Sequence, residues 1–142
     1  MEPHNLQSSD FSSLSLRAEL LESLNLLGYK KMTAVQAESL PITLAGKDIL
    51  AQAETGSGKT AAFGLRMLNT LDSKKYSTQS LVICPTRELA DQVSIEIRQL
   101  AKFMPNIKVL TLCGGKPLGA QLNSLKRHPH IIVGTPGRIL QH

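Results

Sequence analysis

The chain has 142 residues, of which 42% are apolar and 19% charged, so it is long enough for one domain with a hydrophobic core and too apolar for a disordered segment. Its apolar runs, such as residues 81–84, fall far short of the ~20 residues that span a membrane, and two cysteines cannot build a disulfide framework, so we expect a cytoplasmic protein without a membrane partner. Residues 1–72 carry a net charge of −2 and residues 73–142 one of +7, which favours an anionic polymer such as nucleic acid as a partner.

The chain begins with residues 1–10, which are polar and are expected to be flexible. Leucines at helical spacing then predict a helix over residues 16–27, capped by Ser15. A second helix is expected from Thr33 towards Gly46, kinked or broken at Pro41.

Beyond this point the pattern alternates between strands and helices. We expect strands at 48–53, 81–84, 107–112 and 130–133, and helices at 58–71, 87–103 and 118–126. Such alternation predicts an α/β fold with a mostly parallel sheet that is covered by helices on both faces.

A candidate phosphate-binding loop lies between the first expected strand and the helix after it. Residues 53–60 read AETGSGKT, which is close to the pattern G-x-x-x-x-G-K-[ST], although Ala53 replaces the first glycine. Glycines let backbone N–H groups turn towards phosphate oxygens, Lys59 would reach the β- and γ-phosphates, and the Thr60 hydroxyl would ligate Mg²⁺. The candidate cofactor site for ATP and Mg²⁺ therefore comprises Ala53, Glu54, Thr55, Gly56, Ser57, Gly58, Lys59 and Thr60.

Half of such an active site is missing from these residues. Phosphate-loop NTPases hold Mg²⁺ with an acidic residue at the end of an apolar strand, and none of the four aspartates follows an apolar run. A GTPase would also need the base-reading sequence Asn-Lys-x-Asp, but no asparagine of the chain precedes a lysine.

Further strings occur in the order that is typical of one family. PTRELA (85–90), GG (114–115) and TPGR (135–138) follow the phosphate loop, and GY (28–29) with MTAVQ (32–36) precedes it. From residue 11 onward the chain resembles the N-terminal part of a DEAD-box ATP-dependent RNA helicase, with its Q motif, motifs I, Ia and Ib, and GG element. LADQV (89–93) and LTLCGGKP (110–117) indicate more narrowly one bacterial member of this family.

The resemblance implies an adenine site in the Q motif. Tyr29 would stack on the base, Gln36 would hydrogen-bond its edge, and Phe11 would brace the site. The alternative is that Thr33 and Gln36 form a capping box for the second helix. Both roles are compatible, because they use different groups of the same side chains.

The resemblance also implies that the basic half of the chain binds the RNA backbone with little sequence preference. Hydroxyl and guanidinium groups would contact phosphates, and glycines would allow close approach; the alternative for the two arginines is surface salt bridging. The implied RNA-binding residues are Pro85, Thr86, Arg87, Gly114, Gly115, Thr135, Pro136, Gly137 and Arg138.

Together these observations predict a RecA-like domain that is truncated on its C-terminal side, with the Q-motif region at 11–36 and a partial ATP-binding domain at 37–142. The family motifs DEAD and SAT and the second domain with its arginine finger are absent from these residues, so we expect the chain to bind ATP or ADP and RNA but to be inactive alone. The resemblance to the bacterial member implies ribosome biogenesis. The alternative function is a non-catalytic RNA-binding or regulatory fragment.

Overall fold

A computed structural model of the chain describes residues 9–54 and 56–142. The expectation that residues 1–10 are flexible falls almost entirely outside the described residues. A short 3-10 turn, Phe11–Ser13, precedes the regular elements. These are α1 (Ala18–Leu26), α2 (Ala34–Leu44), α3 (Lys59–Thr70), β1 (Ser80–Ile83), α4 (Arg87–Leu100), β2 (Val109–Leu112), α5 (Leu118–Leu125), β3 (Ile131–Gly134) and α6 (Pro136–Gln141).

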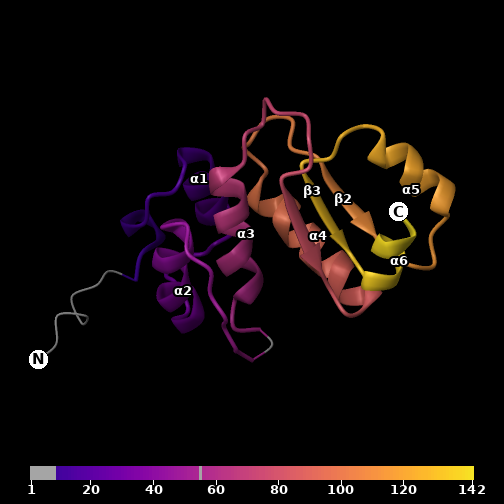
Figure 1. The fold of residues 1–142 in the computed structure, drawn as a ribbon. Helices are drawn as coiled ribbons and strands as arrows, with labels where there is room; N and C mark the ends of the chain where they lie inside the picture. The colour runs from indigo at the N-terminus through magenta and orange to yellow at the C-terminus, as the bar shows by residue number, and fades with distance from the viewer. Residues whose placement is uncertain (1–8, 55) are drawn as a thin grey trace, which may run out of the picture.

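The three strands form a parallel sheet in the order β1-β3-β2. Val82 of β1 and Thr111 of β2 both pair with Val133 of β3, so these three side chains share one face. Because the strands are parallel, the loops that follow them emerge from the same edge of the sheet (Figure 1). This edge is where α/β proteins place ligands, and the parallel sheet predicted from the sequence is confirmed.

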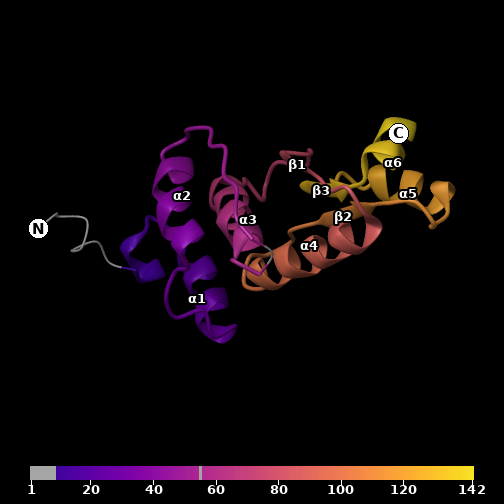
Figure 2. The same ribbon diagram turned by 90° about the horizontal axis from the view of Figure 1, so that it is seen from below.

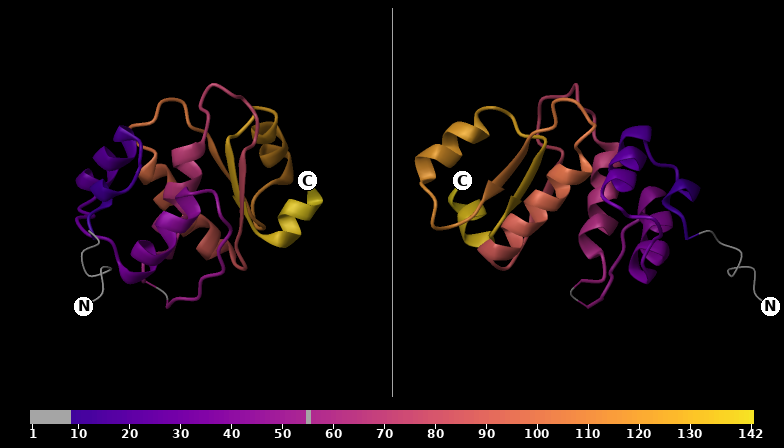
Figure 3. Two further views of the ribbon diagram at one scale, coloured as in Figure 1. Left: turned by 60° about the vertical axis from the view of Figure 1, so that its left-hand side comes forward. Right: turned by 180° about the vertical axis from the view of Figure 1, so that it is seen from behind.

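Helix α4 covers the face of the sheet that carries Val82 and Val133. Its buried side chains, among them Val93 and Ile97, join these residues in the hydrophobic core, and the Thr111 hydroxyl donates a hydrogen bond to Ser94 of α4 at 2.7 Å. Helix α3 packs between α2 and α4, so the helices form successive layers beside the sheet (Figures 2 and 3).

The opposite face is only partly covered, which corrects the expectation of helices over both faces. Helix α5 contacts β2, and Ile139 of α6 lies against Gly134 of β3. At β1, however, Leu81 and Ile83 remain 52% and 59% exposed. An apolar sheet face of this kind requires a covering layer, and none of the described elements provides one at β1.

The expected strand at 48–53 is wrong, because residues 47–54 have no regular structure. A strand forms only where a neighbouring strand accepts and donates its backbone hydrogen bonds, and none of the described strands lies beside this segment. Ile49 and Leu50 are accordingly exposed. A short segment bounded by glycines was therefore not enough to predict a strand here, because a strand also needs a neighbour to pair with.

The first two helices differ in detail from the expected ones. Helix α2 continues through Pro41 to Leu44 and is not broken there, because proline removes a single hydrogen bond from a helix whose preceding turns are packed against α3. Ser15 does not cap α1 with its side chain. Instead, the Asn69 side chain of α3 accepts from the backbone N–H of Arg17 at 2.8 Å, which fixes the start of α1 through a tertiary contact.

None of the helices in the described part of the chain combines the length and apolar character that a membrane span requires.

Candidate nucleotide and RNA sites

The phosphate loop ends where α3 begins. Gly58 adopts the left-handed conformation (φ 88°) at the N-cap of α3, and no side chain caps the first turn of this helix. Its backbone N–H groups therefore remain available to an anion. The hydroxyl of Ser57, which precedes Gly58 in the chain, is the buried side-chain oxygen that lacks a hydrogen-bond partner among the described residues. Both features fit a loop that binds an anion.

Gln36 joins the Q motif to this loop. Its side-chain oxygen accepts from the Thr33 N–H at 2.9 Å, and the Thr33 hydroxyl accepts from the Gln36 N–H, so the capping box is confirmed. The Gln36 side-chain amide also donates to the Gly58 carbonyl at 3.1 Å. A Cβ at Gly58 would collide with this amide. One N–H and one lone pair of the Gln36 amide remain for a base.

Lys59 is folded back over the loop. Its ammonium donates to the Ala53 carbonyl at 2.6 Å, so a phosphate group would replace this carbonyl as its partner.

Thr60 lies one residue further into α3 and is partly exposed, which leaves its hydroxyl accessible to a cation. No group of three or more His, Cys, Asp or Glu side chains within 9–54 and 56–142 is arranged to hold a metal ion, so Mg²⁺ would depend on Thr60, phosphate oxygens and water.

Tyr29 and the loop line one cavity of about 570 Å³ between α3, α4 and β1. The Phe11 ring stacks beside Tyr29 with the ring centroids 6.4 Å apart, which supports the expected bracing role. Glu96 of α4 also lines this cavity, and burial raises its pKa. Burial, with the nearby Glu96 carboxylate, raises the pKa of Tyr29 as well. No sequence signal marked Glu96, since its surroundings depend on the packing of three helices.

Glu96 is expected to make the stability of the protein depend on pH. Because its pKa is raised by burial, the folded state holds this proton more tightly than the unfolded state, and stability falls as pH rises above the ordinary glutamate value. We expect Glu96→Gln to leave the melting temperature unchanged near pH 4 and to raise it at pH 8. Thermal unfolding at both pH values measures this, and a variant that is less stable than wild type at pH 8 would refute it.

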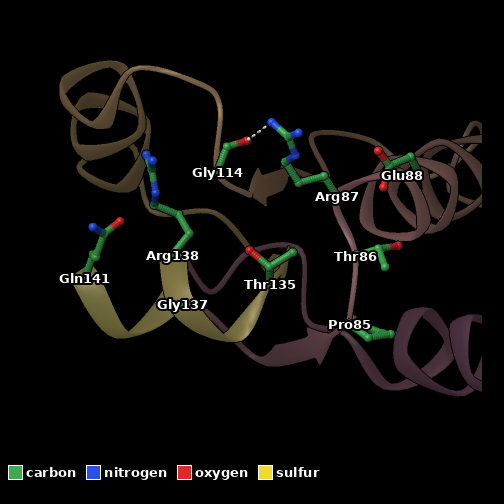
Figure 4. A pocket seen from close by; sticks show the side chains of 9 residues that line it. All are labelled: Pro85, Thr86, Arg87, Glu88, Gly114, Thr135, Gly137, Arg138 and Gln141. Carbon is green, nitrogen blue, oxygen red and sulfur yellow. Dashed lines mark hydrogen bonds between the residues drawn. The ribbon is translucent and has the colours of Figure 1, made fainter.

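The three loops that follow β1, β2 and β3 enclose a second groove of about 570 Å³ (Figure 4). Two lining residues, Glu88 and Gln141, were not expected from the sequence, because they are brought to the groove by the first turn of α4 and the last turn of α6. The sequence-predicted residues that line it are Pro85, Thr86, Arg87, Gly114, Thr135, Gly137 and Arg138.

Two arginines are anchored in this groove by backbone carbonyls of the loop after β2. Arg87 donates from Nη1 to the Gly114 carbonyl at 3.3 Å, and Arg138 donates from Nη1 to the Lys116 carbonyl at 2.9 Å. Gly115 has φ 82°, and a Cβ there would collide with the Arg87 guanidinium. The positive φ therefore favours glycine at this position, and any other residue would also displace the guanidinium of Arg87.

Some expected site residues have other positions or roles. Gly115 and Pro136 are not among the residues that line the groove, and Thr55 lies outside the described residues. Thr86 lines the groove but also caps α4, because its hydroxyl accepts from the Leu89 N–H at 3.2 Å. The alternative of surface salt bridging finds no support for Arg87 or Arg138, since neither forms an ion pair among the described residues.

A glycine-rich loop at the start of a helix, beside a parallel sheet whose carboxyl edge forms a basic groove, defines a RecA-like phosphate-loop domain. A family model described as "DEAD/DEAH box helicase" matches residues 33–142. The chain belongs to this family.

Relatives refine the assignment. The chain is 61% identical over 133 residues to the ATP-dependent RNA helicase DbpA of Escherichia coli K12, covering 93% of this chain and 29% of that protein. It is 50% identical over 132 residues to the DEAD-box ATP-dependent RNA helicase CshA of Bacillus cereus, covering 93% of this chain and 25% of the relative. Residues 89–93 and 110–117 predicted a resemblance to one bacterial member of the family. That member is DbpA, and the 61% sequence identity confirms the prediction. The chain thus spans less than a third of the length of these relatives.

Solved structures agree with this family. A DEAD box protein from Methanococcus jannaschii superimposes with a TM-score of 0.88 at 38% identity, covering 94% of this chain and 36% of that one. Dbp5 of Saccharomyces cerevisiae, bound to RNA and ADP BeF3, gives a TM-score of 0.83 at 30% identity, covering 94% of this chain and 34% of that one. These likenesses confirm the RecA-like fold.

Proposed function

We propose that the chain is the nucleotide- and RNA-contacting part of an ATP-dependent RNA helicase. The single observation that carries this proposal is the groove at the carboxyl edge of the sheet, where residues from three separate loops converge with two anchored arginines. One relative of the same fold, Dbp5, has been solved with RNA and a nucleotide analogue bound.

On the nucleotide side, the proposal assigns adenine to Tyr29 and Gln36 and the phosphates to the loop that ends at Gly58. Lys59 would exchange its bond to the Ala53 carbonyl for bonds to phosphate oxygens, and Thr60 would hold Mg²⁺. When bound, Mg²⁺ neutralises charge that develops on the phosphates. The uncapped first turn of α3 and the unpartnered Ser57 hydroxyl support this assignment.

On the RNA side, the groove offers donors and no base-reading pocket. The guanidinium groups of Arg87 and Arg138 lie where phosphates would pass, and Glu88 is the acidic residue among the described residues that line the groove. Contacts of this kind position a strand without reading its sequence. Cytoplasmic location and ribosome biogenesis remain part of the proposal, supported by the resemblance to DbpA.

The proposal further holds that the rest of the helicase is required for turnover. The described residues supply Lys59 and Thr60 on one side of the phosphates, and phosphoryl transfer also requires groups that activate water and stabilise the developing charge. Those groups would come from the remainder of the protein as a partner.

Two binding measurements on this chain test the proposal. Calorimetry with ADP in the presence of Mg²⁺ and fluorescence anisotropy with a labelled single-stranded RNA of ten nucleotides are both expected to show binding, with the RNA bound more weakly as salt rises. RNA binding without nucleotide binding would instead support the alternative, a non-catalytic RNA-binding fragment. Absence of both would refute both functions.

Base selectivity is expected to depend on the Gln36 amide. Gln36→Ala removes the side-chain amide and its bond to the Thr33 N–H, and it keeps the bond from the backbone N–H of residue 36 to the Thr33 hydroxyl. We therefore expect it to lower the stability by up to about 1 kcal/mol and to narrow the preference for ATP over GTP. Gln36→Glu keeps an acceptor for the Thr33 N–H and loses the N–H donor, so it is expected to retain the cap but also to lose the preference. Competition of ATP and GTP against labelled ADP measures the ratio. A preference that survives in Gln36→Glu would show that the Gln36 amide does not recognise the base and that its role is structural.

A further inference from the structure

Gln121 of α5 is a buried polar side chain that the sequence motifs do not include. It is only 5% exposed, and it lies beneath the groove between the loop after β2 and helix α6. Its amide nitrogen donates to the Cys113 carbonyl at 3.0 Å, and its amide oxygen accepts from Nη1 of Arg138 at 3.0 Å. One side chain thus connects two of the three segments that form the groove.

The orientation of this amide is determined by its partners. A backbone carbonyl can only accept a hydrogen bond and a guanidinium can only donate, so the nitrogen must face Cys113 and the oxygen must face Arg138. The His142 ring nitrogen Nε2 also lies 3.2 Å from this oxygen. The Gln121 amide is therefore satisfied on both sides, as a buried polar group requires.

The hydrogen bonds that Arg138 forms with described residues leave two of its three guanidinium nitrogens available to a ligand. Nη1 carries two hydrogens, and these are used by the Lys116 carbonyl and the Gln121 oxygen. Among the described residues no group accepts from Nε or Nη2 of Arg138. These two nitrogens form one edge of the guanidinium, which is the edge suited to bidentate binding of a phosphate.

We propose that Gln121 is a positioning residue for RNA binding, which holds the guanidinium of Arg138 so that its Nε and Nη2 edge faces the backbone of the bound strand. The inference rests on the proposed function, because it acts through the RNA groove. Its physical basis is preorganisation: an arginine already held in its binding conformation loses less side-chain freedom when a phosphate arrives.

The test uses RNA affinity of the 142-residue chain, measured by anisotropy with a ten-nucleotide single strand. Gln121→Met keeps the volume of the side chain and removes both hydrogen bonds, and we expect affinity to fall about three- to tenfold. ADP affinity should be unchanged. The matched control is Ser124→Ala on the same helix, which removes a hydroxyl that bonds only to the Ala120 carbonyl and should leave RNA affinity unchanged.

A double-mutant cycle separates positioning from a merely structural role. If Gln121 acts through Arg138, then Gln121→Met should have no further effect on RNA affinity in an Arg138→Ala background. A second variant, Gln121→Glu, keeps an oxygen opposite Arg138 and should bind RNA with an affinity between those of wild type and Gln121→Met. Thermal unfolding of each variant gives the folded fraction for which affinities are corrected.

The outcomes distinguish an error in the proposed RNA groove from an error in the positioning role of Gln121. If Arg138→Ala itself leaves RNA affinity unchanged, the proposed RNA groove is wrong. If Arg138→Ala weakens RNA binding while Gln121→Met does not, only the positioning role is overturned. The same holds if the loss of RNA affinity in the double variant equals the product of the losses in the two single variants. An affinity of Gln121→Glu at or below that of Gln121→Met would also contradict it.

Discussion

Replacing Lys59 with alanine is expected to reduce affinity for ADP about 10- to 150-fold. The estimate follows from the loss of one or more hydrogen bonds to a charged phosphate, each worth about 1.5–3 kcal/mol. Among the described residues the Lys59 ammonium hydrogen-bonds only the Ala53 carbonyl, and its side chain is exposed, so the substitution should leave the melting temperature nearly unchanged. Titration calorimetry of both proteins with ADP and Mg²⁺ measures the difference.

The matched control is Lys47→Ala, which removes the same charge from an exposed position before the loop. We expect it to bind ADP as wild type does, because no loop contact involves its ammonium. Equal affinities for wild type and Lys59→Ala would show that residues 53–60 are a glycine turn and not a phosphate site. Equal losses in Lys47→Ala and Lys59→Ala would show that only general electrostatic attraction is at work.

Removing both groove arginines, Arg87→Ala with Arg138→Ala, is expected to weaken RNA binding roughly 10- to 100-fold at low salt. Two phosphate contacts on a single strand correspond to a slope of about 1.4 in the dependence of log affinity on log salt, so the double variant should bind with a slope smaller by about this amount. Anisotropy titrations at several salt concentrations measure both quantities. The loss should be the same for strands of different sequence, since these contacts do not read bases.

The control for net charge is Lys126→Ala with Arg127→Ala, which removes two positive charges just beyond α5, outside the groove. We expect a small, salt-dependent loss of RNA affinity in this variant. If the two double variants lose the same affinity, the groove has no special role and RNA is attracted by the basic half of the chain as a whole. A double arginine variant that discriminates between RNA sequences where wild type does not would contradict backbone recognition.

Local patterns were sufficient for much of the architecture. Strand β3 lies one residue beyond its expected position, α4 begins at Arg87 as expected, and seven of the nine residues expected to bind RNA line a single groove. The elements were predicted correctly because apolar periodicity determines which face of an element is buried. The seven residues meet in one groove because parallel strands bring the loops after them to one edge.

Predictions failed where a contact distant in sequence decides the local structure. Residues 48–53 were predicted as a strand because they are short and bounded by glycines, but no described strand pairs with them. The start of α1 is fixed by Asn69, more than fifty residues away, and the raised pKa of Glu96 comes from burial among other elements. None of these partners is adjacent in the sequence, so no local pattern carries the signal.

The sequence by itself therefore determined the family and the basic half of the chain, and it predicted a phosphate loop, because these depend on residue types and their spacings. Only the tertiary structure decided how the side chains are used. It shows that Gln36 serves a capping box and the Gly58 carbonyl at once, and that Gln121 connects Cys113 to Arg138. The reason is physical: hydrogen bonds of buried polar groups are satisfied by whichever partners folding brings within about 3 Å, and those partners lie on other elements.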